Sequence, residues 1–269
     1  MISKEIVVNR NPSKGSPWTR EEMILVLNLY FKLSYGQMDH RTPAVKELAQ
    51  LMGRTDNTIA LRLNNFAACD PVLQARGIKA MGGQKRRCQP FWDEFVADRE
   101  ALAYESERIL SAYQGVDIEE KFKDDLQDIP KGLKGEDRIR EVKTRVNQRF
   151  FRQMVLANYN GQCALTGIEL SELLVASHII PWADNEEERL NPQNGICLSS
   201  MYDKAFDKGL ISFLDDGSVV FSERLKINVG KDYYDRYFEP IKHEKLVKPR
   251  KYLLNPSFLE YHRDNIFNR

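Results

Sequence analysis

The spacing of apolar residues changes along the chain, and this change constrains the fold more than any other feature. Before residue 114 apolar residues recur at helical spacing, whereas after residue 159 they form short runs with strand character, at 173–180 and 195–198. A hairpin is expected over 210–221, with a type I′ turn at Asp215-Asp216-Gly217. A polar connector with glycine and proline, 114–135, separates the two patterns. A length of 269 residues suits two domains. We predict an α+β protein with a helical domain at 1–114, a linker at 115–139 and a second domain at 140–269.

The N-terminal part has the outline of a helix-turn-helix unit. A first helix is expected after Thr19, with Glu22 three residues on in a capping box. A second helix over about 44–52 stops at Gly53, and a third starts at Thr55 or Asp56 and runs through Phe66. This order of helices is typical of DNA-binding helix-turn-helix modules.

The third helix and the basic segment after it supply the candidate DNA contacts. If the apolar stripe of the helix is buried, its polar side chains face outward, where base edges or phosphates are within reach. The segment 77–89 is expected to be a flexible basic loop, and a long helix is expected after it, from about Phe91 to Tyr113. The candidates are Asn57, Thr58, Arg62, Asn65, Lys85, Arg86 and Arg87. The alternative is a plain helical bundle with a polar exterior.

Composition excludes several classes of protein. No apolar run approaches the ~20 residues of a membrane helix, and the first residues lack the apolar region of a signal peptide, so a cytoplasmic protein is expected. The net charge of +1 favours no particular partner. Locally, eight lysines and arginines stand against three acids over 131–152. Within that stretch Arg149 and Arg152 are candidates for phosphate contact or for ion pairs with the acidic loop 184–188.

Four features with chemical potential lie in one window of the second domain. Ser177 and His178 end an expected strand, Asn194 follows, and Asp203 and Asp207 lie on a short expected helix. The spacing of four residues places both carboxylates on one face of that helix. Two hard oxygen donors facing an imidazole suit a magnesium-type site beside a general base.

These residues resemble the motif of HNH endonucleases, with Asp203 in place of the final histidine. The flanking sequences strengthen the similarity over about 147–225. They are Tyr159-x3-Cys163-Ala-Leu-Thr-Gly167, Ala176-Ser-His-Ile-Ile-Pro-Trp182, Asn194-Gly-Ile-Cys-Leu198 and Asp203-Lys-Ala-Phe-Asp-Lys-Gly-Leu210. They are similar to the bacterial subfamily found in restriction and anti-phage systems.

The resemblance implies a ββα-metal fold that hydrolyses phosphodiester bonds. It implies that His178 is the general base, that Asn194 orients the strand end, and that Asp203 and Asp207 hold Mg²⁺ or Mn²⁺. Products would carry a 5′ phosphate. Ser177 stands where many members have a metal-binding Asp or His, which leaves Asp207 or waters to complete the metal shell. The paired cysteine knuckles of many members are missing, so no structural zinc is expected.

The leading interpretation is a two-domain endonuclease that cuts double-stranded DNA in a restriction or anti-phage system. The alternative is a non-cleaving helix-turn-helix regulator that retains a nuclease fold, and a third reading is an RNA nuclease or effector activated by another subunit. Cutting both strands would suggest a homodimer. Three further histidines, His40, His243 and His262, have no ligand-spaced partners and are expected at the surface.

Overall fold

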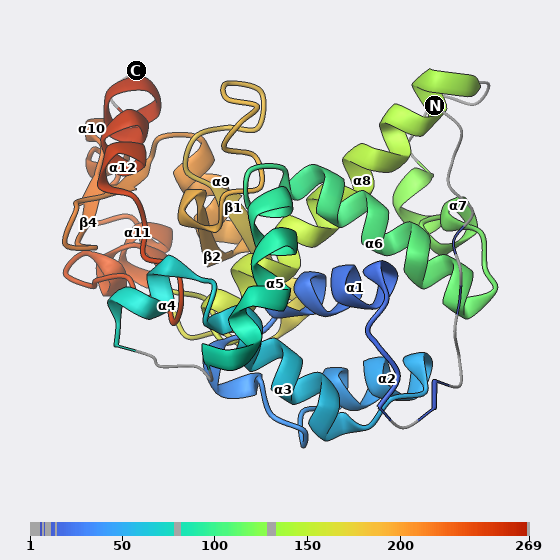
Figure 1. Cartoon of the computed structure of the whole chain (residues 1–269). Coiled ribbons are helices and arrows are strands. Elements are labelled where there is room, and N and C mark those ends of the chain that lie inside the picture. The colour runs from blue at the N-terminus through green and yellow to red at the C-terminus, as the bar shows by residue number, and fades with distance from the viewer. Residues whose placement is uncertain are drawn as a thin grey trace. The chain divides into compact units, whose positions relative to one another are not determined.

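The computed structural model describes residues 6, 8, 12–13, 15–77, 82–127 and 133–267. The chain forms two compact units, Met1–Phe150 and Phe151–Arg269 (Figure 1). The boundary lies inside one long helix, α8 (Gly135–Asn158), rather than in the connector. The connector itself forms a short helix, α7 (Ile118–Lys121), and a 3-10 turn at Asp124–Leu126, while its positions 128–132, which include Pro130 and Gly132, lie outside the described residues.

The first three helices follow the predictions from the sequence. Helix α1 (Arg20–Phe31) begins with the expected capping box, in which Thr19 and Glu22 each bond the other's backbone N–H. Helix α2 (Pro43–Met52) ends at Gly53, whose left-handed conformation (φ 64°) permits the tight turn. Helix α3 (Asp56–Ala67) is capped by the Thr55 hydroxyl. Both α1 and α2 pack against α3.

The rest of the N-terminal unit differs from the prediction in two places. After α4 (Pro71–Ala75), helix α5 (Gly82–Val96) covers most of the segment expected as a flexible loop, so Lys85, Arg86 and Arg87 are helical. The long helix expected from residue 91 to 113 is divided, because Asp98 caps a new helix, α6 (Arg99–Gln114).

Aromatic rings form the centre of this unit's core. Tyr30 lies against Phe31, Phe66 and Trp92, with ring centroids 5.5 to 6.5 Å apart. The buried hydroxyl of Tyr30 donates a 2.5 Å hydrogen bond to Asp70, which in turn caps α4. Burial of these rings from α1, α3 and α5 removes apolar area from water and so stabilises the unit.

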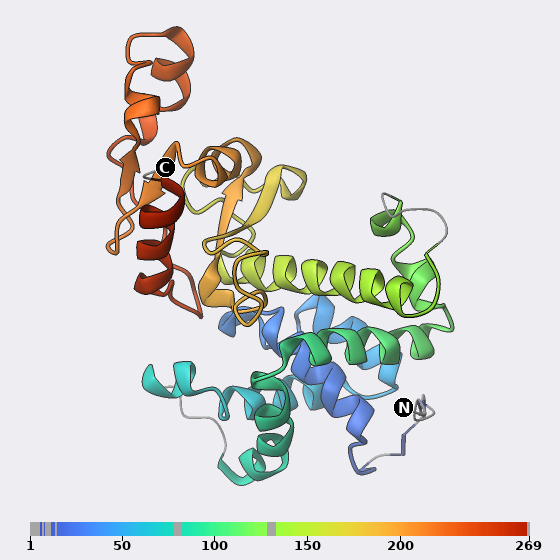
Figure 2. The ribbon, with the colours of Figure 1, turned by 90° about the horizontal axis from the view of Figure 1, so that it is seen from above.

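The C-terminal unit is built on two antiparallel strands and a helix, as predicted. Strands β1 (Leu174–His178) and β2 (Gly195–Ser199) pair with His178 opposite Gly195. Helix α9 (Ser200–Asp207) follows β2 directly and packs against both strands. In Figure 2 the C-terminal part of α8 runs beside this strand pair. The chain between the strands, 179–194, is a long loop that ends in a 3-10 turn, Pro192–Asn194.

A hairpin and three short helices complete the unit. Strands β3 (Ile211–Phe213) and β4 (Val219–Phe221) pair as expected. Their connection is not the predicted type I′ turn, because only Gly217 has a positive φ, of 84°, in a longer loop from 214 to 218. Three helices follow, α10 (Glu223–Lys226), α11 (Asp232–Tyr237) and α12 (Pro256–His262).

One predicted surface histidine lies in the core. His262 is 1% exposed, stacks on Phe206 with centroids 3.7 Å apart, and donates from Nε2 to the Phe206 carbonyl oxygen at 3.1 Å. Its Nδ1 accepts from the Ser212 hydroxyl at 2.9 Å. The expectation of a surface position for His262 is therefore wrong, and burial lowers its pKa to about 4.

The four cysteines are reduced and buried. Cys163 accepts a hydrogen bond at Sγ from the backbone N–H of Ser199, which ties the turn after α8 to the end of β2. Among the described residues, no helix combines the length and the apolar character that crossing a membrane requires.

Candidate active site

The strand pair and α9 bring the predicted site residues into one small region. His178 ends β1, Asn194 immediately precedes β2, and Asp203 and Asp207 lie on α9, which packs on both strands. The region is therefore fixed by backbone pairing rather than by side-chain contacts alone. Helix α8 closes it on the side of β2, where Phe151 and Val155 face the strand.

The imidazole of His178 is held in one orientation and one tautomer. Its ring stacks on Phe151, with centroids 3.8 Å apart, and meets the edge of Trp182 at 5.5 Å. Nε2 lies 3.0 Å from the carbonyl oxygen of Arg189. A carbonyl can only accept, so Nε2 carries the proton and Nδ1 keeps its lone pair. Burial lowers the pKa of His178, which keeps the ring neutral near pH 7.

Asn194 fastens the loop that carries this carbonyl. Its Oδ1 accepts from the Ile180 N–H at 2.8 Å, and its Nδ2 donates to the carbonyl oxygens of Ile180 and Glu188, each at 3.1 Å. The side chain is 1% exposed. It thus joins the chain just after His178 to the residue just before Arg189.

Gly195 allows helix α8 to approach the strand pair. A Cβ at this position would lie 2.3 Å from Cγ2 of Val155 and 2.9 Å from Cζ of Phe151. Only glycine lets β2 pack this closely on the helix. The stacking of Phe151 on His178 depends on the same close approach.

The two aspartates of α9 form a negatively charged pair beside β1. Asp203 is partly buried and Asp207 lies at the exposed end of the helix. Desolvation raises the pKa of both carboxyls, and the charge of Asp203 raises that of Asp207 further. Interaction with Ser177 opposes the rise at Asp203. Within the part of the chain that the structure describes, neither carboxylate forms an ion pair, although Lys204 and Lys208 lie near enough to lower their pKa values.

This arrangement fits a divalent cation. Ser177 is 2% exposed, and its hydroxyl lies beside the Asp203 carboxyl, whose pKa it lowers. Two carboxylates without an ion pair next to this buried hydroxyl form a hard oxygen-donor set, for which Mg²⁺ or Mn²⁺ is suited. The described residues contain no cluster of three or more His, Cys, Asp or Glu side chains at metal-binding distances. A cation bound here would therefore take further ligands from water or substrate.

The two arginines proposed for phosphate contact are bound within the protein. Arg149 pairs with Asp125 at 3.1 Å and lies over the ring of Phe122. Arg152 donates to the carbonyl oxygens of Leu174 and Ser171 at 2.6 and 2.8 Å. Neither arginine forms an ion pair with the acidic loop 184–188. Arg152 anchors the start of β1, which explains its position without a nucleic acid.

The predicted outward face of α3 is only partly exposed. Asn57 is exposed and Thr58 half-buried, but Arg62 and Asn65 are 6% and 1% exposed, so the prediction that these two face outward is wrong. The segment around Trp18 and helix α5 cover them. Five of the seven N-terminal candidates nevertheless line one cavity. They are Thr58, Arg62, Asn65, Arg86 and Arg87.

Two contributors to the site were not expected from the sequence. Phe151 provides the stacking surface for His178, and the backbone carbonyl of Arg189 sets its tautomer. Arg189 is itself fixed by a bond from Nε to the Trp182 carbonyl oxygen at 2.8 Å. A carbonyl leaves no signal in side-chain patterns. Phe151 reads as one more apolar position of an amphipathic helix.

Comparison with known proteins supports the resemblance. Residues 163–214 match the profile of a family described as HNH endonuclease. The matched segment contains β1, β2, α9 and β3, and hence His178, Asn194, Asp203 and Asp207. The C-terminal unit thus contains a segment that is similar to HNH endonucleases, within a fold of helices and small sheets. No curated protein sequence matches the chain.

Proposed function

We propose that the protein is a divalent-metal-dependent endonuclease that hydrolyses DNA phosphodiester bonds and serves in a restriction or anti-phage system. The observation that carries the proposal is the fixed tautomer of His178. Nε2 donates to the Arg189 carbonyl, so Nδ1 is an acceptor on a neutral ring. A neutral imidazole with a free lone pair is suited to remove a proton from water at neutral pH.

Each residue of the site has a distinct task in this proposal. His178 accepts the proton of the attacking water at Nδ1, and Phe151 keeps the ring plane fixed while the charge develops. Asn194 holds the loop that positions the Arg189 carbonyl. Asp203 and Asp207 would hold the cation, with Ser177 beside them. When bound, the cation supplies positive charge that stabilises the phosphate and the leaving oxygen.

A plasmid-nicking assay tests the proposal. Supercoiled plasmid is incubated with the full chain, with Mg²⁺ or with chelator, and the conversion to nicked and linear forms is followed. Metal-dependent nicking that His178→Ala abolishes is the expected result. Nicking that continues with chelator, or with His178→Ala at the rate of the original chain, contradicts it. The same digestion of phage DNA grown in modifying and non-modifying hosts tests the defence assignment.

One observation favours a second candidate function, a DNA-binding protein that does not cleave. Ser177 occupies the place where many HNH nucleases have an acidic or imidazole ligand, which leaves fewer groups for a cation. This candidate requires binding to duplex DNA without nicking under any divalent metal. The nicking assay, run beside a mobility-shift assay on the same plasmid fragments, separates the two functions.

A further inference from the structure

A cavity of about 990 Å³ lies in the N-terminal unit. It is lined by residues 12, 13 and 15–18, by the chain around Gly53 and Arg54, and by helices α3 and α5. This volume is at the upper end of the range of cavities that hold small organic molecules, roughly 300–1,000 Å³. It far exceeds the space that a single inorganic ion needs.

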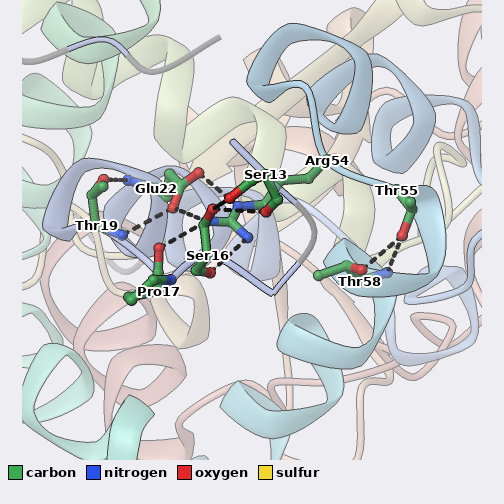
Figure 3. Close-up of polar contacts among 8 residues, drawn as sticks. All are labelled: Ser13, Ser16, Pro17, Thr19, Glu22, Arg54, Thr55 and Thr58. Atoms are coloured by element: carbon green, nitrogen blue, oxygen red, sulfur yellow. Dashed lines mark hydrogen bonds and ion pairs between the residues drawn. The ribbon is translucent and has the colours of Figure 1, made fainter. Parts of the chain in front are cut away.

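One side of the cavity is a rigid, charge-balanced wall. Arg54 donates from Nε and Nη2 to both carboxylate oxygens of Glu22, at 2.6 and 2.7 Å, and from its Nη atoms to the carbonyl oxygens of Ser16 and Pro17 (Figure 3). Glu22 is fully buried and also caps α1. The charge of Arg54 is therefore neutralised inside the protein. Its function is to fix the segment that carries Trp18, whose ring lies 4.4 Å from the guanidinium.

The other side holds a buried cation without an anion. Arg62 is 6% exposed, its guanidinium lies 4.7 Å from the centroid of Trp18, and its Nε has no hydrogen-bond partner. One of its Nη atoms donates to the thiol of Cys88 at 3.7 Å, and a thiol is a weak acceptor. Among the described residues no carboxylate pairs with it. A buried, unpaired charge is strongly unfavourable unless a ligand of opposite charge completes it.

Asn65 adds a second unsatisfied group to the same wall. It lies three residues after Arg62 on α3, so the two side chains are neighbours on the helix surface. It is 1% exposed, and its Oδ1 accepts no hydrogen bond. The cavity wall thus presents a positively charged hydrogen-bond donor, the guanidinium of Arg62, beside a neutral acceptor, Oδ1 of Asn65. Arg62 Nε and Asn65 Oδ1 have no hydrogen-bond partner within the protein. Apolar surface from Trp18, Pro90 and Phe91 borders them.

We propose that this cavity binds a nucleotide, with its phosphate on Arg62 and its base against the apolar border. Arg86 and Arg87 are exposed at the cavity and add positive charge, which favours a dianionic phosphate over a carboxylate. The Asn65 oxygen is placed to accept from the amino group of a base. This nucleotide is either a residue of a DNA strand whose base is turned out of the base stack, or a free mononucleotide. This site goes beyond the proposed cleavage, because its occupation does not require an active HNH segment.

Binding to the full chain in the presence of chelator tests the site without cleavage. The probes are each of the four deoxynucleoside 5′-monophosphates, inorganic phosphate and a short DNA duplex. Tryptophan fluorescence has contributions from Trp18, Trp92 and Trp182, of which Trp18 lines the cavity, and thermal shift gives a second readout. The variant is Arg62→Met, which keeps an unbranched side chain and removes the guanidinium with its charge. The matched control is Lys46→Met, which removes an exposed cation on α2 that does not line the cavity.

The original chain is expected to bind a mononucleotide or the duplex saturably, and Arg62→Met to weaken that binding by about tenfold or more. Without ligand, Arg62→Met should melt at the same or a higher temperature, since it removes an unpaired buried charge. If Arg62→Met weakens the binding of mononucleotides, the ligand is a free nucleotide. If it weakens the binding of the duplex alone, the ligand is a nucleotide of a DNA strand. Should Arg62→Met not fold, Asn65→Asp, which places a carboxylate beside Arg62, must weaken binding instead.

Three results would overturn the proposal. The first is that Arg62→Met, or Asn65→Asp in its place, binds every probe as tightly as Lys46→Met does. The second is that inorganic phosphate competes as well as any nucleotide, which would show that the apolar border contributes nothing to the affinity. The third is that no probe binds saturably. None of these results depends on whether the protein cleaves DNA, so the proposed nuclease activity stands or falls separately.

Discussion

The rings of Phe151 and His178 are parallel to within 12°, with their centroids 3.8 Å apart. Phe151 belongs to helix α8 and His178 to strand β1, so the orientation of the proposed base is set by a helix outside the HNH-matched residues. The proton on Nε2 is fixed by the Arg189 carbonyl. Two separate parts of the chain thus determine where the free lone pair of Nδ1 points.

Replacement of His178 by alanine should abolish cleavage and leave DNA binding nearly unchanged. Loss of a general base lowers the rate by a factor of about 10²–10⁴. The measurement is single-turnover cleavage together with a mobility shift on the same DNA. The control is His243→Ala, which removes an exposed histidine of the same unit. Equal cleavage rates for the two variants would contradict the assignment of His178.

Replacement of Asp203 by asparagine should remove the response to divalent metal, and Asp207→Asn should weaken it. The two carboxylates repel each other, and both pKa values are raised without a cation. At a Mg²⁺ concentration about 100 times the dissociation constant, binding adds about 2.7 kcal/mol to the free energy of unfolding. Thermal unfolding with and without Mg²⁺ measures this for each variant. Asp232→Asn, on α11, is the control, and an equal Mg²⁺ response in all three variants would exclude the site.

Replacement of Gly195 by alanine should destabilise the C-terminal unit by about 1–3 kcal/mol, because the new methyl group would overlap Val155 and Phe151. The cleavage rate should fall by more than the loss of folded protein explains, because Phe151 must move away from His178. The matched control is Gly36→Ala, where a Cβ meets no atom within 4 Å. The free energy of unfolding, measured in denaturant, and the cleavage rate are compared between the two variants. A Gly195→Ala variant as stable as Gly36→Ala would show that the packing is looser than described.

Replacement of Asn194 by alanine should lower the cleavage rate with little change in the affinity for DNA. The amide makes three hydrogen bonds to the loop backbone, and its loss leaves buried groups unsatisfied at a cost of about 1–3 kcal/mol each. The Arg189 carbonyl would then no longer hold His178 in one tautomer. Kinetics that separate kcat from KM test this. A variant with an unchanged kcat and a raised KM would instead place Asn194 in contact with the substrate.

The buried His262 should make the stability of the C-terminal unit depend on pH. Its pKa is about 4 in the folded protein, against 6.5 for a free histidine. Below pH 6.5 His262 binds a proton in the unfolded chain but not in the folded chain. The free energy of unfolding therefore falls as the pH drops toward 4. The total loss is about 3 kcal/mol. Denaturant unfolding of the original chain and of His262→Gln over this range should show a steeper pH dependence for the original chain, and parallel curves would contradict this.

The sequence predicts local structure well wherever a capping residue or a turn glycine marks a boundary. Thr19, Thr55 and Asn255 cap the helices that follow them, and Gly53 ends α2, as their types predict. The strand pair and α9 also follow from short-range patterns. These features are local, so a single sequence contains most of the information they need.

Features that depend on distant segments could not be predicted in the same way. Helical spacing placed Arg62 and Asn65 on the polar side of α3, but it gave no indication that Trp18 and α5 would cover that side. Arg152 carries a charge typical of a phosphate contact, yet its partners are the backbone carbonyls of Leu174 and Ser171, 22 and 19 residues away. His262 is buried by α9 and β3, which precede it by about 50 residues.

The burial of all four thiols has a practical consequence for labelling chemistry. Burial raises the pKa of Cys69 and Cys197 to about 12, so almost no thiolate exists there at neutral pH to react with a maleimide. A single cysteine introduced at an exposed position, such as Asn57 or Lys208, would therefore carry a fluorophore alone. The protein can be tagged on either unit without first removing its native cysteines, so the approach of a nucleic acid to each unit can be followed one molecule at a time.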